Sequence, residues 1–196
     1  ERSTSLSKRA LDIGADGIIV PWMEKVEEVE EAVRDCRYPP EGRRGIGGER
    51  ATVWGQCLNE HANEANENVL VIPLIESINA IPNVANMCKV DGIDLFFFGP
   101  ADFSASAGHR GQWEGPGVAE QILELKDIIN AAGKHCGVMS TSVQNLTERR
   151  DQGFRMIALG PDSGLLMRSL HQSLKEVGCD RIPATSLDPA DGDAKS

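Results

Sequence analysis

The chain has 196 residues, of which 40% are hydrophobic and 26% are charged, a composition typical of a soluble globular α/β protein. Its 30 acidic residues outnumber its 20 basic residues, and the net charge of −10 argues against nucleic acid or an anionic membrane as a partner. No apolar run approaches the roughly 18 residues of a transmembrane helix, and no signal peptide opens the chain, so we expect a cytoplasmic protein. The five cysteines include no Cys-x-x-Cys pair, which favours reduced thiols.

Short apolar runs and helical periodicities alternate along the chain. The first helix is expected at residues 5–14, because Leu6, Ala10 and Leu11 share one side and Gly14 is suited to end it. Buried strands are expected at residues 16–21, 69–76, 93–102, 135–140 and 154–160. Amphipathic helices are expected at residues 23–37, 77–89, 118–133, 143–152 and 163–177. Residues 38–48 and 101–117 are expected to form loops, and residues 51–68 are ambiguous, with a helix broken near Gly55 as one interpretation.

The strict alternation of five strands with helices indicates a parallel α/β sheet with right-handed crossovers. A closed (β/α)₈ TIM barrel takes about 250 residues. Five units that begin within an element therefore fit the last five-eighths of such a barrel, and a complete open doubly wound sheet is the alternative. We expect one barrel domain over residues 1–182 and a disordered polar tail over residues 183–196.

Two of the expected strands end on a carboxylate. Glu76 closes the apolar run 69–76, and Asp102 closes the run 93–102. Because parallel strands of an α/β fold place their carboxyl ends at the same edge, the two acids could share one divalent cation. The alternative is that each acid only caps the helix that follows its strand.

Five segments, in order and spacing, resemble the HpcH/HpaI aldolase/citrate lyase family, specifically its 4-hydroxy-2-oxo-acid (class II pyruvate) aldolase branch. The segments are GADGIIVP at 14–21, RYPPEGRRG at 37–45, PLIE at 73–76, FFGPADFSASAG at 97–108 and GPDSGLL at 160–166. The resemblance implies a pyruvate-kinase-like (β/α)₈ barrel that assembles into homotrimers or hexamers. It also implies an enzyme that cleaves 4-hydroxy-2-oxo acids to pyruvate and an aldehyde through a metal-stabilised enolate.

The resemblance also assigns roles to individual residues. Glu76 and Asp102 would bind Mg²⁺, Mn²⁺ or Co²⁺, and the 2-oxo acid would chelate this ion. Backbone amides in one turn would hold the substrate carboxylate; the turn consists of Gly99, Pro100, Ala101 and Asp102. Phe97 and Met139 match apolar positions that line the aldehyde pocket, although either could belong to the barrel core.

Three further positions carry weaker assignments. Asp12 matches an aspartate that reaches a neighbouring subunit and pairs with its catalytic histidine, and an ordinary charge near a helix end is the alternative. Arg43 and Arg44 lie in the glycine-rich loop that flanks the site, where surface charge is the favoured interpretation.

Two departures from the family pattern affect the functional prediction. Leu74 stands where the family often has glutamine, which leaves the exact substrate open. The family's catalytic histidine and arginine lie on the first strands of the barrel, which have no counterpart in this chain. No histidine of this chain matches that base, and we expect all of them to be structural or solvent-exposed; they are His61, His109, His135 and His171.

Several functions remain open at this stage. Within the family, the alternatives are a citrate-lyase-like acyl-CoA lyase and an oxaloacetate-decarboxylating relative, although this acidic chain shows no basic groove for the phosphates of CoA. The alternative from another class is a catalytically incomplete chain that only binds metal or ligand, or associates with full-length subunits.

Overall fold

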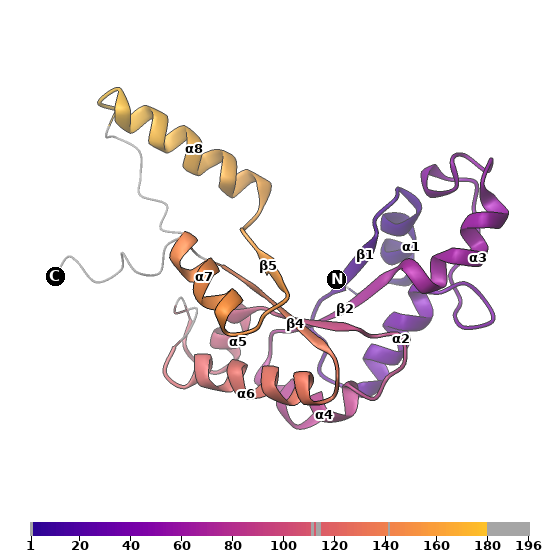
Figure 1. Cartoon of the computed structure of the whole chain (residues 1–196), viewed down its shortest axis with the longest axis horizontal. Helices are drawn as coiled ribbons and strands as arrows, with labels where there is room; N and C mark the ends of the chain where they lie inside the picture. The colour runs from indigo at the N-terminus through magenta and orange to yellow at the C-terminus, as the bar shows by residue number, and fades with distance from the viewer. Residues whose placement is uncertain (1, 111, 113–114, 141, 180–196) are drawn as a thin grey trace. The chain divides into compact units, whose positions relative to one another are not determined.

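The computed structural model describes residues 2–110, 112, 115–140 and 142–179 (Figure 1). The predicted tail at residues 183–196 lies outside these residues. The chain divides into two compact units, Glu1–Gly137 and Val138–Ser196. Within the described ranges, no helix combines the length and apolar character needed to cross a membrane.

The first unit alternates strands with helices, as the sequence predicts. It contains α1 (Thr4–Asp12), β1 (Gly17–Val20), α2 (Val26–Cys36), η1 (Arg50–Thr52), α3 (Leu58–Asn68), β2 (Leu70–Ile75), η2 (Ile78–Asn83), α4 (Val84–Met87), β3 (Leu95–Phe98), α5 (Pro100–Ser106) and α6 (Val118–Ala131). Strand β4 (His135–Met139) begins in this unit and ends in the second. The second unit also contains α7 (Val143–Asp151), β5 (Met156–Ala158) and α8 (Asp162–Glu176).

The strands follow one another in the order β1-β2-β3-β4-β5. Strand β1 pairs in parallel with β2, with Ile18 opposite Val71, and β2 pairs in parallel with β3, with Leu74 opposite Phe97. This sequential order lacks the reversal of strand order that defines doubly wound sheets, and it agrees with the order of strands in a (β/α) barrel.

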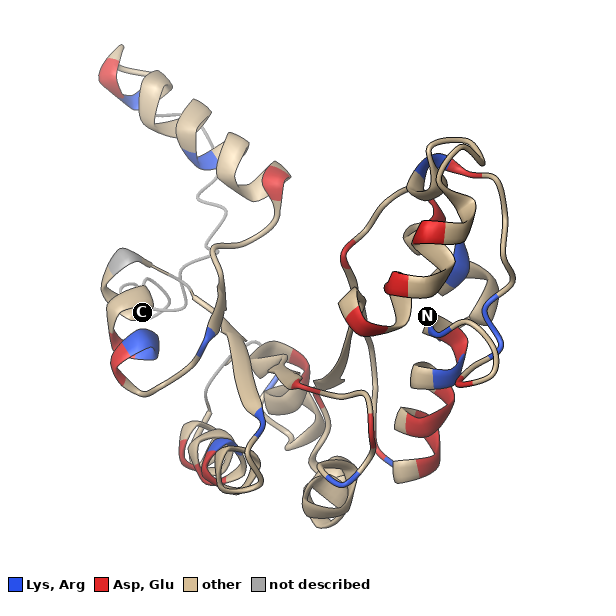
Figure 2. Cartoon of the chain, turned by 45° about the vertical axis from the view of Figure 1, so that its right-hand side comes forward, with Lys and Arg blue, Asp and Glu red and all other residues tan. Residues whose placement is uncertain are grey.

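The core of the first unit consists of strand residues with helix residues packed on them. Ile75, Phe96 and Phe98 are fully buried on β2 and β3. Helix α2, along which Figure 2 shows several acidic residues, packs on β2 and buries Val29, while Glu27, Glu30 and Glu31 are exposed. The amphipathic helix predicted in this region is therefore confirmed. Glu76, the residue after β2, therefore follows a strand that is packed into the core.

Three element boundaries differ from the sequence prediction. Residues 100–106 were expected in a strand end and a loop, but they form α5, with Pro100 in the first turn and Phe103 fully buried. The strand before it ends at Phe98, so Asp102 lies in a helix and not at a strand end. The predicted helix at 77–89 is divided into η2 and α4, with Pro82 inside η2.

The predicted reduced thiols are confirmed, because the five cysteines, all among the described residues, are free. Burial raises the pKa of Cys36 to about 11 and that of Cys136 to about 12. Both side chains therefore remain protonated at neutral pH and act as small apolar core residues.

Candidate metal and substrate site

Glu76 follows the last residue of β2 and is only 5% exposed. Its Oε1 accepts a hydrogen bond of 2.9 Å from the backbone N–H of Trp22, which lies two residues beyond the end of β1. The parallel pairing of β1 with β2 brings these two residues together. Trp22 adopts a positive φ of 55°, a conformation that costs a residue other than glycine about 1 to 3 kcal/mol. The strained backbone therefore directs an amide at one oxygen of a buried carboxylate.

The turn after β3 lies beside the other oxygen of Glu76. The N–H of Gly99 donates to the carbonyl of Ile75 at 3.0 Å, which attaches this turn to the end of β2. A Cβ placed on Gly99 would lie 3.0 Å from the Glu76 Cβ and 3.1 Å from its Oε2. The absence of a side chain at this position thus permits the close approach of the turn to Glu76.

Asp102 lies in the first turn of α5 and is exposed. The pKa of Glu76 is raised above its ordinary value, mainly by burial of the carboxyl group. The hydrogen bond from Trp22 lowers this pKa, and the negative charge of Asp102 raises it. The structure therefore brings the two predicted acids within electrostatic range of each other. Because the ionised form of Glu76 is disfavoured as the chain stands, a cation at this point would be stabilising.

The donor set fits a hard divalent cation. Within the described part of the chain, no group of three or more His, Cys, Asp or Glu side chains could hold a metal ion. Two carboxylates that leave the other coordination positions to water and to oxygen atoms of a substrate are the arrangement that Mg²⁺ commonly uses in proteins. The N–H groups of the first helical turn, which includes Ala101 and Asp102, lack intrahelical acceptors, as at the start of any α-helix.

The two residues assigned to an aldehyde pocket lie in different environments. Phe97 is 4% exposed on β3, opposite Leu74 of β2. Met139 is the last residue of β4 and is half-buried in the second unit. The burial of Phe97 agrees with the alternative prediction that it belongs to the barrel core.

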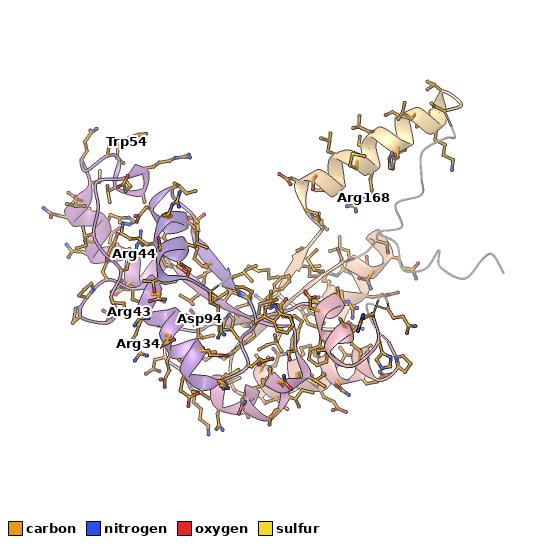
Figure 3. All side chains as sticks on the ribbon, turned by 180° about the vertical axis from the view of Figure 1, so that it is seen from behind. Arg34, Arg43, Arg44, Trp54, Asp94 and Arg168 are labelled. Atoms are coloured by element: carbon orange, nitrogen blue, oxygen red, sulfur yellow. The ribbon has the colours of Figure 1, made fainter. Side chains whose placement is uncertain are left out.

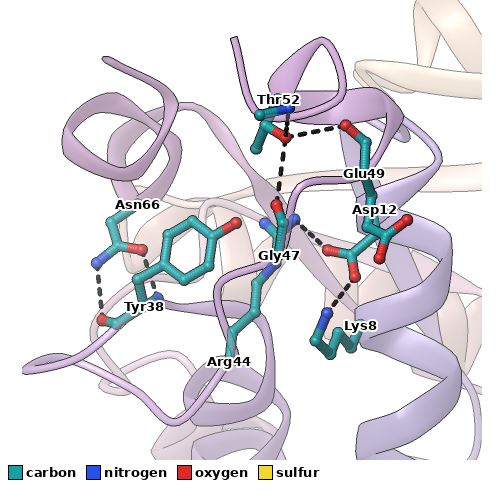
Figure 4. Close-up of polar contacts among 9 residues, drawn as sticks. Lys8, Asp12, Tyr38, Arg44, Gly47, Glu49, Thr52 and Asn66 are labelled. Atoms are coloured by element: carbon teal, nitrogen blue, oxygen red, sulfur yellow. Dashed lines mark hydrogen bonds and ion pairs between the residues drawn. The ribbon is translucent and has the colours of Figure 1, made fainter. Parts of the chain in front are cut away.

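Asp12 lies in a buried polar cluster at the carboxyl end of α1 (Figure 4). It is 8% exposed, and its carboxylate accepts hydrogen bonds from Lys8 and, at 3.0 Å, from Nη2 of Arg44. The Arg44 guanidinium also lies 4.5 Å from the centroid of the Tyr38 ring. We call these four residues the Asp12 cluster.

The two arginines of the glycine-rich loop differ from each other (Figure 3). Arg43 is exposed and pairs with Asp35, which confirms the prediction of a surface charge. Arg44 is 2% exposed, so the same prediction is wrong for Arg44. Its burial is possible because Asp12 and Tyr38 offset the loss of hydration of the guanidinium.

The sequence profile of the HpcH/HpaI aldolase/citrate lyase family matches residues 1–169. The chain belongs to this family. It is 37% identical over 171 residues to a hydroxypyruvate/pyruvate aldolase of Pseudomonas aeruginosa, an alignment that covers 86% of the chain and 63% of that relative. It is 39% identical over 166 residues to a 4-hydroxy-2-oxovalerate aldolase of Rhodococcus jostii, and this alignment covers 84% of the chain and 64% of that relative. The chain therefore spans less than two thirds of the length of these relatives.

A crystal structure of an HpcH/HpaI family protein from Burkholderia cenocepacia shares the fold with a TM-score of 0.83 and 32% identity. The superposition covers 90% of this chain and 70% of that one. The predicted fold class, the last five β/α units of a family barrel, is confirmed.

Changing Gly99 to alanine tests how closely the turn must approach Glu76. The new Cβ would lie 3.0 to 3.1 Å from Glu76 atoms, so the carboxylate must move by a few tenths of an ångström. We expect the affinity for Mn²⁺, measured by calorimetry, to fall about tenfold, as for other changes beside a metal ligand. Gly47→Ala is the matched control, because its Cβ would meet nothing closer than 3.5 Å. Equal affinities in both variants would contradict this interpretation.

Proposed function

We propose that this chain forms part of a divalent-metal-dependent aldolase that cleaves 4-hydroxy-2-oxo acids to pyruvate and an aldehyde. The observation that carries the proposal is the buried carboxylate of Glu76 at the carboxyl end of β2, whose pKa is raised by burial and by the charge of Asp102 in α5, the helix that follows β3. Active sites of (β/α) barrels lie at this end of the strands. The names of the two relatives support a 2-oxo acid as the substrate class.

In this proposal, Glu76 and Asp102 hold Mg²⁺, Mn²⁺ or Co²⁺. When bound, the cation supplies a Lewis acid that stabilises negative charge on the substrate's keto oxygen. The Trp22 amide fixes Oε1 of Glu76, which leaves Oε2 on the side of the Gly99 turn. The first-turn amides of α5 would bind the substrate carboxylate. Phe97 and Met139 would contact the aldehyde, and Asp12 would contact the catalytic histidine of a neighbouring subunit.

The reaction breaks the bond between C3 and C4 of the substrate. The C4 hydroxyl loses its proton as the aldehyde forms, and C3 then gains a proton to give pyruvate. Each proton transfer needs a positioned acid or base, and such a group typically raises the reaction rate by about 10² to 10⁴-fold. None of the described histidines is a site residue in this proposal, so we expect the 196-residue chain alone to bind metal and pyruvate without appreciable turnover.

The test separates binding from turnover. Electron paramagnetic resonance of Mn²⁺ with the 196-residue chain should change on addition of pyruvate, and Glu76→Ala should abolish the change. A chain extended upstream of Glu1 should release pyruvate from a 4-hydroxy-2-oxo acid, in a chelator-sensitive manner that coupled NADH oxidation by lactate dehydrogenase can follow. Rapid pyruvate release by the 196-residue chain itself would contradict the proposed division of roles. Turnover of an acyl-CoA substrate instead would favour the citrate-lyase alternative.

We also propose that residues 1–182 belong to one barrel domain of a cytoplasmic homo-oligomer, a trimer or hexamer. Helix α8 supports the oligomer, because its apolar side chains are largely exposed: Leu165, Leu166, Met167, Leu170 and Leu174 are each at least 38% exposed. An apolar surface of this kind on a single helix is typical of one that another chain covers.

Leu166→Glu should therefore shift the chain to smaller species. Leu166 is 61% exposed, and burying a carboxylate in its place would be costly in an interface. Sedimentation velocity measures the result, and Ser169→Glu, at an exposed polar position of the same helix, is the control. The same distribution of species for both variants would show that α8 does not contribute to assembly.

A further inference from the structure

Leu74 lies on the same face of the sheet as the candidate metal ligand Glu76. Side chains alternate between the two faces along a strand, so Leu74, two residues before Glu76, points to the same side. The parallel register places Phe97 opposite Leu74, so Phe97 and Gly99 belong to this face as well. Glu76 and Gly99 form the layer at the carboxyl ends of the strands. Leu74 and Phe97 form the next layer towards the amino ends.

One methyl group of Leu74 borders the space beside Oε2 of Glu76. A Cβ placed on Gly99 would lie 3.1 Å from Oε2 of Glu76 and 3.6 Å from Cδ1 of Leu74. Oε1 of Glu76 is engaged by the Trp22 amide, so Oε2 is the oxygen available to a cation. Leu74 and Gly99 are each half-buried, so a ligand can approach them from solvent. A ligand atom next to Oε2 therefore lies beside an apolar side chain.

The wall that borders this space is apolar. The side chains of Leu74 and Phe97 are hydrocarbon, and the N–H of Gly99 already donates to the carbonyl of Ile75 at 3.0 Å. In the proposed function, the cation and the first-turn amides of α5 hold the carboxylate and keto oxygens of the 2-oxo acid. The remaining carbon is C3, which carries no polar atom in pyruvate. C3 is therefore the part of the substrate that suits this wall.

We propose that C3 of the bound 2-oxo acid packs against Leu74, and that Leu74 selects substrates whose C3 carries only hydrogen or an alkyl group. A hydroxyl group on C3, as in hydroxypyruvate, would lose its hydration without gaining a hydrogen bond from Leu74. A methyl group in the same place would gain apolar contact. The inference rests on the proposed function, because it requires the 2-oxo acid to bind at Glu76.

The test compares two 2-oxo acids of nearly the same shape. 2-Oxobutyrate carries a methyl group on C3, and hydroxypyruvate carries a hydroxyl group there. Each acid is titrated into the 196-residue chain saturated with Mn²⁺, and calorimetry gives its dissociation constant. We expect 2-oxobutyrate to bind about 10- to 100-fold more tightly, the range over which an apolar pocket separates a methyl group from a hydroxyl group. This comparison requires no change to the protein.

A polar side chain in place of Leu74 should remove the preference. Leu74→Asn keeps the branched shape of leucine but adds a donor and an acceptor, so we expect the two acids to bind this variant with nearly equal affinity. Leu74→Met stays apolar and should keep the preference. Leu70→Asn is the matched control, because Leu70 is 40% exposed on the same face of β2, at the opposite end of the strand. It should leave both affinities unchanged.

The affinities of the unchanged chain separate a failure of this inference from a failure of the aldolase proposal. Equal binding of 2-oxobutyrate and hydroxypyruvate would overturn the role of Leu74 alone. A preference that persists in Leu74→Asn would also overturn this role, because another residue would then set the selectivity. If neither acid bound in the presence of Mn²⁺, the aldolase proposal would fall together with the role of Leu74.

Discussion

Replacing Arg44 with methionine is expected to lower the free energy of unfolding by about 3 kcal/mol. Breaking a buried ion pair by removing one partner typically costs about 3 to 5 kcal/mol, because the other charge is left buried. Here Asp12 keeps its bond from Lys8, which places the expected loss at the lower end of that range. The stacking of the guanidinium on Tyr38 is lost as well. Urea unfolding followed by circular dichroism measures the change.

The neighbouring arginine supplies the control for this prediction. Arg43→Met removes an exposed ion pair with Asp35, so we expect little change in stability. The double variant Asp12→Asn with Arg44→Met should be less destabilised than the sum of the single variants, because no uncompensated buried charge remains. If Arg44→Met and Arg43→Met unfolded at the same urea concentration, the Asp12 cluster would not contribute to stability.

The strand positions and Glu76 could be predicted from the sequence because their signals are local. A short apolar run predicts a buried strand, and the acid that ends the run is predicted to lie at the carboxyl end of that strand. The structure has β2 and Glu76 in these positions. The same reasoning placed Asp102 at a strand end, although it lies in α5. Residues 100–106 are rich in small residues typical of loops. The deciding interaction is the burial of Phe103 against the core, and this is not visible in the local sequence.

The burial of Arg44 could not be predicted because its partners are distant in sequence. An arginine in a glycine-rich loop is expected at the surface. Only the structure shows that its acceptor is Asp12, which precedes it by 32 positions in the chain. The positive φ of Trp22 was unpredictable for a similar reason. No local preference favours this conformation for tryptophan, and it is held where β1 and β2 align its amide with Glu76. Side chains and backbone conformations that depend on pairing between elements are thus the part of the site that sequence patterns miss.

Saturating Mn²⁺ is expected to stabilise the chain by about 2.7 kcal/mol at a free concentration 100 times the dissociation constant. Glu76→Gln should remove this effect, because it replaces the buried ligand with a neutral amide. Without metal, the same variant should be more stable than the wild type at neutral pH, since the ionised Glu76 carboxylate is disfavoured by burial and by Asp102. In a chain of this size, about 1 kcal/mol corresponds to a change in Tm of about 2 to 4 °C. Thermal unfolding with and without Mn²⁺ measures both effects.

The pH dependence gives this prediction a second measurement. Folding raises the pKa of Glu76, so the metal-free wild type gains stability as the pH falls through that raised pKa towards the ordinary value of a glutamate. The advantage of Glu76→Gln should therefore shrink as the solution becomes more acidic. Mn²⁺ binding requires the ionised carboxylate, so it should weaken over the same pH interval, at a higher pH than for an ordinary glutamate.

Glu67→Gln, at an exposed position on α3, should respond to Mn²⁺ and to pH as the wild type does. Full Mn²⁺ stabilisation of Glu76→Gln would show that the cation binds elsewhere, and it would remove the main support for metal-dependent chemistry at this site.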